Sequence, residues 1–172
     1  MAAAKLAAGL AELAAGEAAV DLSYEGIGDE GVAKVADALA GNATCTTLGL
    51  SGNKITDVGL GRLVEALRGN TTMTKLVLYG NQITDGGASS LAEMLRGNTT
   101  MTTLDLNGNH PSLSAAAKQA VDALVTQNTE DPAAAAARAA AAGAAAAAAP
   151  SPEKAEIVEE EAGAGRQIQL AA

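Results

Sequence analysis

The stretch LVLYGNQI, residues 76–83, decides the fold of this chain, because its pattern returns at a fixed spacing. Leucine stands at the first and third positions, asparagine at the sixth and isoleucine at the eighth. The pattern occurs earlier as LGLSGNKI (48–55) and later, without the isoleucine, as LDLNGN (104–109), so its copies begin 28 residues apart. A weaker copy, VDLSYEGI (20–27), precedes them by the same step. The chain therefore contains about four repeats, and these must be interpreted before any single motif.

Each repeat combines two hydrophobic periodicities. The Leu-x-Leu segment alternates, which is typical of a short strand with one buried face. The second half of a unit spaces apolar residues three or four apart, as at Leu60, Leu63 and Leu67, which predicts a helix with one buried stripe. One unit cannot bury its own stripe, whereas stacked units form a continuous core. We therefore expect an α/β fold in which strands and helices alternate along a short solenoid.

The repeats resemble leucine-rich repeats of the ribonuclease-inhibitor-like type, and similar units occur in nucleotide-binding leucine-rich-repeat receptors and the Ran GTPase-activating protein. The resemblance covers residues 17–128 and implies a right-handed β-α horseshoe arc with a parallel concave sheet and convex helices. Its pattern changes at both ends. Glu25 replaces the asparagine of the first unit, and Pro111 stands in the isoleucine place of the fourth, where a two-residue insertion makes Leu113 the equivalent. Atypical terminal units are expected of caps.

We expect three regions along the chain. Residues 1–16 form an N-terminal capping helix, because Leu6, Leu10 and Leu13 share one helical face and Glu12 interrupts any signal-peptide core. Residues 17–128 hold about four leucine-rich repeats, and a helix over 114–127 covers their far end. Residues 129–172 form a low-complexity tail, in which an alanine run (133–149) precedes five glutamates between 153 and 161.

The composition argues against several functions. The formal net charge is −9, which disfavours binding to nucleic acid or to an anionic membrane. The single cysteine, Cys45, cannot form an internal disulfide and is expected in the core, since methionine takes its place in two later repeats. The single histidine, His110, excludes a site with several histidine ligands. No stretch suggests a transmembrane helix. We expect a cytoplasmic monomer without cofactor, metal or enzymatic activity.

Three motifs imitate chemical sites. Residues 26–31 match the dinucleotide-binding pattern GxGxxG, but Ile27 and Gly31 are repeat positions and Asp29 would repel a pyrophosphate. Residues 105–109 begin like a calcium-binding loop, yet His110 stands where glycine is required. The asparagines of three N-x-T sequons recur at one repeat position, and we expect them in turns at helix ends: Asn42, Asn70 and Asn98.

Another set of asparagines has an inferable structural role. Asn53, Asn81 and Asn109 follow the strand of their repeat, where the chain turns and leaves backbone groups unpaired. A side-chain amide donates and accepts at once, so one asparagine per unit can form a ladder along the solenoid. Removing one is expected to leave buried polar groups without partners and to cost about 1–3 kcal/mol.

Function is expected on the concave sheet face, to which the residues that alternate with the strand leucines point. The selected partner-binding residues are Asp21, Lys75, Val77, Tyr79, Asp105 and Asn107. Tyr79 is the main candidate, because aromatic residues are favoured interface anchors. Lys75 is expected beside Asp105, where it either pairs with that carboxylate or faces a partner. Ser51 is expected on the same face.

The leading interpretation is a non-catalytic protein–protein interaction module or scaffold that binds a protein partner. Four strands make a face only about 15 Å wide, so a single copy should bind weakly. Two alternatives stay open, a regulatory role of the GTPase-activating type and a fragment of a larger leucine-rich-repeat signalling protein. The first of these rests on fold analogy alone.

Overall fold

Four short parallel strands form one sheet in the order in which they occur along the chain. The computed structural model describes residues 2–109, 113–133, 136–137 and 140. The strands are β1 (Ala19–Asp21), β2 (Thr47–Gly49), β3 (Lys75–Val77) and β4 (Thr103–Asp105). Leu48 pairs with Val20 on one side and with Leu76 on the other, and Leu76 pairs with Leu104. The strand register therefore equals the spacing of the sequence repeat.

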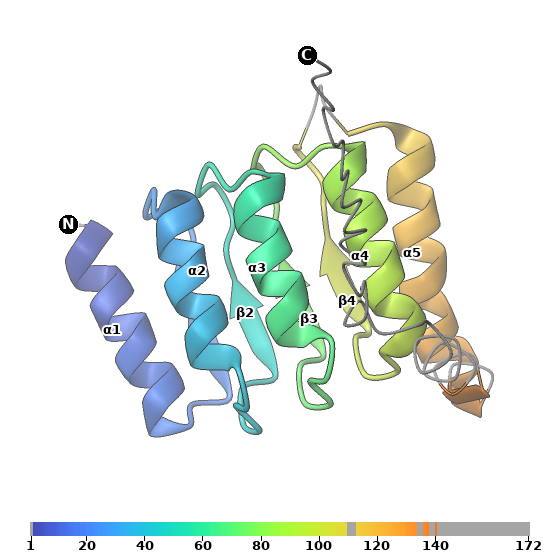
Figure 1. The fold of residues 1–172 in the computed structure, drawn as a ribbon, viewed down its shortest axis with the longest axis horizontal. Coiled ribbons are helices and arrows are strands. Elements are labelled where there is room, and N and C mark those ends of the chain that lie inside the picture. Colours follow the sequence, from blue (N-terminus) through green and yellow to red (C-terminus); the bar gives the residue numbers. More distant parts are fainter. Residues whose placement is uncertain (1, 110–112, 134–135, 138–139, 141–172) are drawn as a thin grey trace, which may run out of the picture.

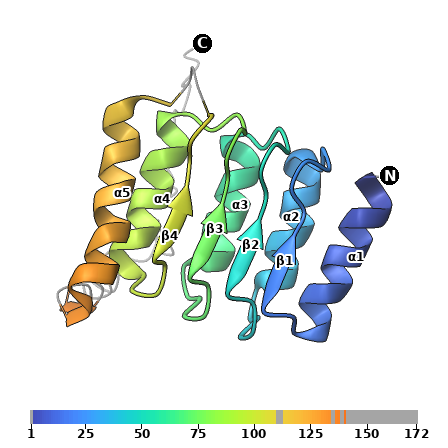
Figure 2. The same cartoon turned by 180° about the vertical axis from the view of Figure 1, so that it is seen from behind.

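Three helices cover one face of this sheet, each in the connection between two consecutive strands (Figure 1). They are α2 (Gly28–Leu39), α3 (Asp57–Leu67) and α4 (Asp85–Gly97). Figure 2 shows the strands from the other side, where no helix of the described chain crosses them. The fold is thus the α/β solenoid expected from the repeats, with one sheet face open.

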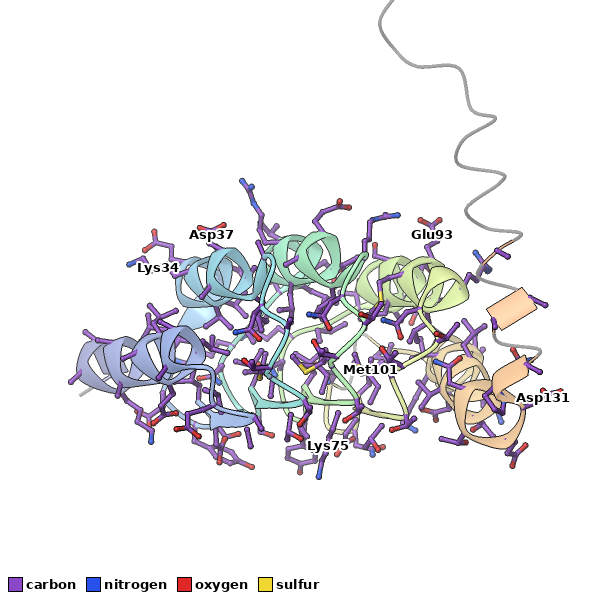
Figure 3. The ribbon with its side chains drawn as sticks, turned by 90° about the horizontal axis from the view of Figure 1, so that it is seen from below. Lys34, Asp37, Lys75, Glu93, Met101 and Asp131 are labelled. Carbon is purple, nitrogen blue, oxygen red and sulfur yellow. The ribbon has the colours of Figure 1, made fainter. Side chains whose placement is uncertain are left out.

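The terminal helices lie at the two ends of the stack. Figure 3 shows α1 (Ala2–Ala15) and α5 (Ala115–Glu130) closer to the plane of the sheet than α2, α3 and α4. Leu13 of α1 is buried, and so are Val121 and Val125 of α5. Gly9 has no side chain, and a Cβ there would come within 2.6 Å of Leu22 Cδ2. This close approach lets α1 pack on the first repeat.

The repeated apolar positions form one continuous core. The leucines of the strands and of α2, α3 and α4 are almost fully buried, and Cys45 and Met73 lie among them. The prediction that the Cys45 thiol belongs to the core is confirmed. The fully buried positions include Leu48, Leu50, Ile55, Leu60, Leu63, Leu67, Leu76, Leu78 and Ile83.

The helix caps follow the repeat in the second and third units and depart from it in the first and fourth. Thr56 and Thr84 cap α3 and α4, because each hydroxyl oxygen accepts from the backbone N–H two residues later. Ile27 precedes α2 and provides no side-chain cap. Ser114 caps α5 two residues later than the repeat spacing requires. Leu113 packs against the core, in agreement with a two-residue insertion in the fourth unit.

Helix α5 differs from its predicted bounds. It begins at Ala115 and continues to Glu130, whereas the sequence predicted an end at residue 127. Asn128 is buried, so the last turn belongs to the packed part of the solenoid. The predictions for Pro111 and His110, for most of the alanine run and for the acidic segment lie outside the described residues. Within the described part, no helix combines the length and apolar character needed to cross a bilayer.

Candidate functional site

The predicted asparagine ladder is present beneath the turns that follow the strands. Asn81 Oδ1 accepts from the backbone N–H groups of Asn53 and Ile55 at 2.9 and 3.1 Å. Its Nδ2 donates to the carbonyl oxygens of Leu50 and Leu78 at 2.9 and 3.0 Å. One buried side chain therefore joins two neighbouring units. Equivalent bonds are made by Asn53 and Asn109.

A second ladder, which the sequence interpretation missed, runs along the opposite ends of the strands. The Nδ2 groups of Asn70 and Asn98 each donate to the backbone carbonyl of the asparagine one repeat earlier, at 3.0 Å. Asn42 begins the series by donating to Leu13 of α1, and Asn128 of α5 ends it by donating to Asn98. The equal spacing of the sequons was a detectable signal, but it was assigned to local turns only.

This second ladder explains the three sequons structurally. In each of them the asparagine Oδ1 accepts from backbone N–H groups two and three residues later, so the local turn that was predicted is also present. The amide nitrogen to which a glycan would be attached already donates a hydrogen bond to a backbone carbonyl of the preceding unit or of α1. Asn70 and Asn98 are also buried.

A third series of polar contacts joins the helix starts. Asp29 accepts from both the backbone N–H and the hydroxyl of Thr56 in the next unit. Asp57 accepts from Thr84 in the same way, and Asp85 accepts from the backbone N–H of Ser114. These carboxylates therefore hold the next helix cap in place. Sequence interpretation had considered Asp29 only as a charge that would repel a phosphate.

The residues of two sequence motifs that resemble ligand-binding sites make structural contacts within the fold. In residues 26–31, the N–H of Gly28 donates to the carbonyl of Asn53, and a Cβ on Gly31 would come within 2.5 Å of Ile27 Cβ. In residues 105–109, the Asp105 carboxylate accepts from Asn107. Among the described residues, no group of three or more His, Cys, Asp or Glu side chains is placed to hold a metal ion.

The open face of the sheet carries a shallow hollow of about 270 Å³. Its floor includes Gly49, which has no side chain, and Asp21, Lys75 and Val77 stand around it. A Cβ on Gly49 would come within 2.5 Å of Asp21 Oδ1. The glycine therefore leaves room both for this carboxylate and for the hollow. Three of the six predicted partner-binding residues meet here.

Lys75 projects from the sheet on the side opposite to α2, α3 and α4 (Figure 3). Its side chain is exposed, and it makes no ion pair with a residue that the structure describes. In the sheet register Lys75 lies opposite Thr103, whereas Asp105 lies opposite Val77. Of the two alternatives for Lys75, the structure shows no ion pair with Asp105, and contact with a partner stays a prediction.

Both strand aspartates are held by local hydrogen bonds. Asp21 Oδ1 accepts from Ser23 N at 3.0 Å, and Asp105 Oδ1 accepts from Asn107 N at 2.9 Å and from Asn107 Nδ2 at 2.7 Å. Hydrogen bonds from the side chain and backbone of Ser23 lower the pKa of Asp21, and the charge of Lys5 acts in the same direction. The Asp21 carboxylate is therefore both fixed in place and charged at neutral pH.

Tyr79 and Asn107 lie just beyond the ends of β3 and β4. Tyr79 is 44% exposed and Asn107 is exposed, while Val77 is half-buried on the sheet. Ser51, which was expected to be exposed on the concave face, is only 7% exposed. The reason is that the chain has already begun to turn at this position, where Ser51 N donates to Ser23 Oγ and its carbonyl accepts from Tyr24.

These features define a leucine-rich-repeat solenoid, and comparison with known proteins supports that fold. The family described as "Leucine Rich repeat" matches residues 41–64, 69–92 and 97–110. Each matched segment begins at the glycine before an asparagine of the second ladder, so the matches follow the same spacing as the strands. Three leucine-rich repeats are thus recognised, and the first, atypical unit is not among them. No curated protein matches the chain.

Two solved structures share the architecture. One is described as "Leiomodin-1 Actin-Binding Site 2 (ABS2)" and is 19% identical in sequence. The alignment covers 72% of this chain and 88% of the leiomodin chain, with a TM-score of 0.53. The other is the C-terminal domain of tropomodulin from Caenorhabditis elegans, 11% identical, with 73% and 93% covered and a TM-score of 0.50. At these identities the similarity extends to the fold alone.

Proposed function

We propose that this chain is a non-catalytic interaction module that binds a protein partner on the open, concave face of its sheet. The proposed contact residues are Asp21, Lys75, Val77, Tyr79, Asp105 and Asn107. The open face offers a fixed charge pattern, with a lysine between two aspartates that stand on the outer strands. Such complementary charges determine which partner binds and how fast it associates.

The observation that carries the proposal is the position of Lys75. Its side chain extends from an uncovered sheet beside a hollow, and no described carboxylate forms an ion pair with it. A long cationic side chain gains little packing energy in this position, whereas it can pair with an acidic group of a partner whose side chain enters the hollow. Tyr79 supplies an aromatic anchor at the edge of the same surface.

We further propose that the repeats are of the ribonuclease-inhibitor-like type, since the units follow one constant spacing and one helix connects each strand to the next. In this proposal residues 1–16 are a cap, 17–128 are the repeats and 129–172 are a tail, whose first two residues continue α5. The four-stranded face is about 15 Å wide, so binding by this surface alone should be weak.

Affinity capture from native lysate tests the proposed surface. The full chain, a Lys75→Glu/Tyr79→Ala variant and a Lys34→Glu control would be compared. Lys34 lies on α2, on the helical side of the molecule (Figure 3), so its reversal changes the net charge as Lys75→Glu does without touching the sheet. A partner kept by the control and lost by the double variant supports the proposal. A partner that the double variant retains contradicts it.

Actin is the first purified protein to test, because one structural neighbour is described as an actin-binding site. Co-sedimentation with filaments and fluorescence with labelled monomers would measure binding to the full chain. Binding that Lys75→Glu weakens and Lys34→Glu leaves unchanged identifies the partner. An absence of binding removes actin and leaves the proposal of a concave interface to be decided by the capture experiment.

A further inference from the structure

Within the described part of the chain, all three large hydrophobic side chains that are exposed lie on one rim of the solenoid. They are Tyr24, Val58 and Tyr79, with exposed fractions of 71%, 75% and 44%. We call this surface the strand-to-helix rim, which comprises residues 22–30, 50–58 and 78–86. It is the upper edge in Figures 1 and 2, where the strands end and α2, α3 and α4 begin. Exposed apolar residues gathered on one surface mark interaction sites.

The two tyrosine rings rest on glycines of the following repeat. A Cβ on Gly52 would come within 2.7 Å of Tyr24 Cε1, and a Cβ on Gly108 would come within 3.1 Å of Tyr79 Cε2. Both glycines have a positive φ, so the turn and the missing side chain are required together. Contact with the backbone limits the movement of each ring, and a rigid aromatic ring loses little conformational entropy when it binds a ligand.

Side chains do not cover the backbone at Gly80, between the two rings. Gly80 belongs to the third unit, between the glycines that support Tyr24 and Tyr79, and a Cβ on it would find its nearest neighbour only at 3.9 Å. A ligand that touches both rings can therefore also approach the backbone of Gly80 without displacing a side chain. Its N–H already donates to the carbonyl of Asn107, so the ligand need not supply an acceptor for it.

The spacing of the rings fits one kind of peptide. The Tyr24 ring lies over Gly52 of unit two and the Tyr79 ring over Gly108 of unit four. These glycines are equivalent positions, and neighbouring parallel strands lie about 4.8 Å apart, so the two ring positions are about 10 Å apart along the solenoid. A polyproline II helix has three residues per turn and rises about 3.1 Å per residue, which makes one turn about 9 Å. Residues i and i+3 of such a peptide would meet the two rings, and aromatic residues are the usual contact surface for proline in this conformation.

The charge of the rim selects among such peptides. Glu25, Glu30 and Asp85 are exposed or half-exposed there, and Lys54 is the one lysine or arginine in the defined rim segments. The rim is therefore acidic, which favours a ligand carrying positive charge. An arginine next to the prolines would also stack on a tyrosine ring.

We propose that the strand-to-helix rim binds a basic, proline-rich segment of a partner protein in the polyproline II conformation, held between Tyr24 and Tyr79. The proposal deepens the proposed function, on which it rests through Tyr79, and it adds Tyr24 and a partner class. Proline supplies the preformed ligand shape, and the flanking positive charges supply the attraction to the acidic rim.

The test is fluorescence anisotropy with the full chain and a labelled synthetic peptide of consecutive prolines flanked by arginines. Tyr24→Ala and Tyr79→Ala are each expected to weaken binding about tenfold, as truncation of an interface anchor does. Tyr79→Phe keeps the ring and should bind as the unmodified chain does. Asp37→Ala, on the helical side (Figure 3), removes an acid far from the rim and should change little. Far-UV circular dichroism would verify that each variant is folded.

Two control peptides separate the contributions of shape and charge. Replacing the prolines with glycines should abolish binding, because the flexible peptide loses the preformed spacing. Replacing the arginines with glutamates should weaken binding strongly. Absence of binding by the arginine–proline peptide, equal binding by the glycine peptide, or binding that neither tyrosine variant weakens would overturn the inference.

The outcome is distinguishable from that of the proposed function. Lys75→Glu alters the sheet face and not the rim, so it should not weaken binding of the positively charged probe. If capture of a partner depends on Lys75 while the probe does not bind, the concave site stands and the rim inference fails. If the probe binds through both tyrosines while a captured partner is kept by Lys75→Glu and lost by Tyr79→Ala, the rim inference stands and the concave site fails.

Discussion

Replacing Asn81 with alanine is the most informative perturbation of this solenoid. Asn81 is 6% exposed, and its side chain bonds five backbone groups in two neighbouring repeats. Alanine removes the acceptor of the Asn53 and Ile55 N–H groups, both of which are buried. Each unsatisfied buried group costs about 1–3 kcal/mol, so the two N–H groups together imply a loss of about 4 kcal/mol. That is a large fraction of the stability of a domain.

The assay is urea unfolding followed by circular dichroism at the helix band, because the chain has no tryptophan. Asn107→Ala is the matched control. Asn107 is an exposed asparagine in the next repeat whose amide donates to Asp105. The control is expected to change the free energy of unfolding by less than about 0.5 kcal/mol. Asn81→Asp keeps acceptor oxygens but loses both N–H donors, and at neutral pH it places a buried charge against the Leu50 and Leu78 carbonyl oxygens, so it should not restore the stability of the unmodified chain.

The reasoning fails if Asn81→Ala and Asn107→Ala lose the same stability. Two small losses would mean that water satisfies the backbone groups after the substitution, or that adjacent repeats are not coupled through this amide. Two equally large losses would also contradict it, because the exposed amide of Asn107 joins no two repeats.

Three further predictions concern packing, thiol reactivity and pH. Gly59→Ala in α3 should destabilise the chain by about 1–3 kcal/mol in the same urea assay, because a Cβ would come within 2.8 Å of Val32 Cγ1 in α2. Gly61→Ala, two residues further along α3, should instead stabilise the chain by about 0.5–1 kcal/mol, because a Cβ there would have no neighbour within 4 Å. Burial raises the pKa of the Cys45 thiol, so a disulfide reagent should label it only as fast as the chain opens, and rapid labelling of the folded chain would contradict its placement. Asp21 has a folded pKa below its unfolded value, so its stabilising contribution is present above about pH 4 and is lost as the pH falls through the folded pKa. The difference in unfolding free energy between the unmodified chain and Asp21→Asn should therefore vanish in acid. A difference that grows in acid would refute the assignment.

The repeat spacing allowed most of the fold to be predicted from sequence. Strands and helices follow from local periodicity, and stacking of equal units makes the strand register equal to the repeat length. The role of Asn53 and Asn81 was also predictable, because an amide that recurs at the turn of each repeat can bond the backbone of the adjacent repeat. The bounds of α5 were less predictable, since Asn128 extends the packed region through a contact with a distant loop.

The candidate site was predictable only in part. Alternation along the strands correctly placed Lys75 and Val77 on the open face, around a hollow. Whether Lys75 pairs with Asp105 depends on the sheet register, which sets Thr103 opposite the lysine. Ser51 was expected on the open face, but the strand ends before this residue, which is only 7% exposed.

The sequence alone determined the number of repeats, the alternation of strand and helix and the buried leucine stripe, because each is a periodic property of neighbouring residues. Apart from the first asparagine ladder, the tertiary structure alone decided which residues meet between units. The second asparagine ladder, the Asp29 contact with Thr56 and the support of Tyr24 by Gly52 each join residues about one repeat apart. Such contacts need the units to be stacked at a defined distance, and that distance is set by packing of the whole core rather than by any local sequence.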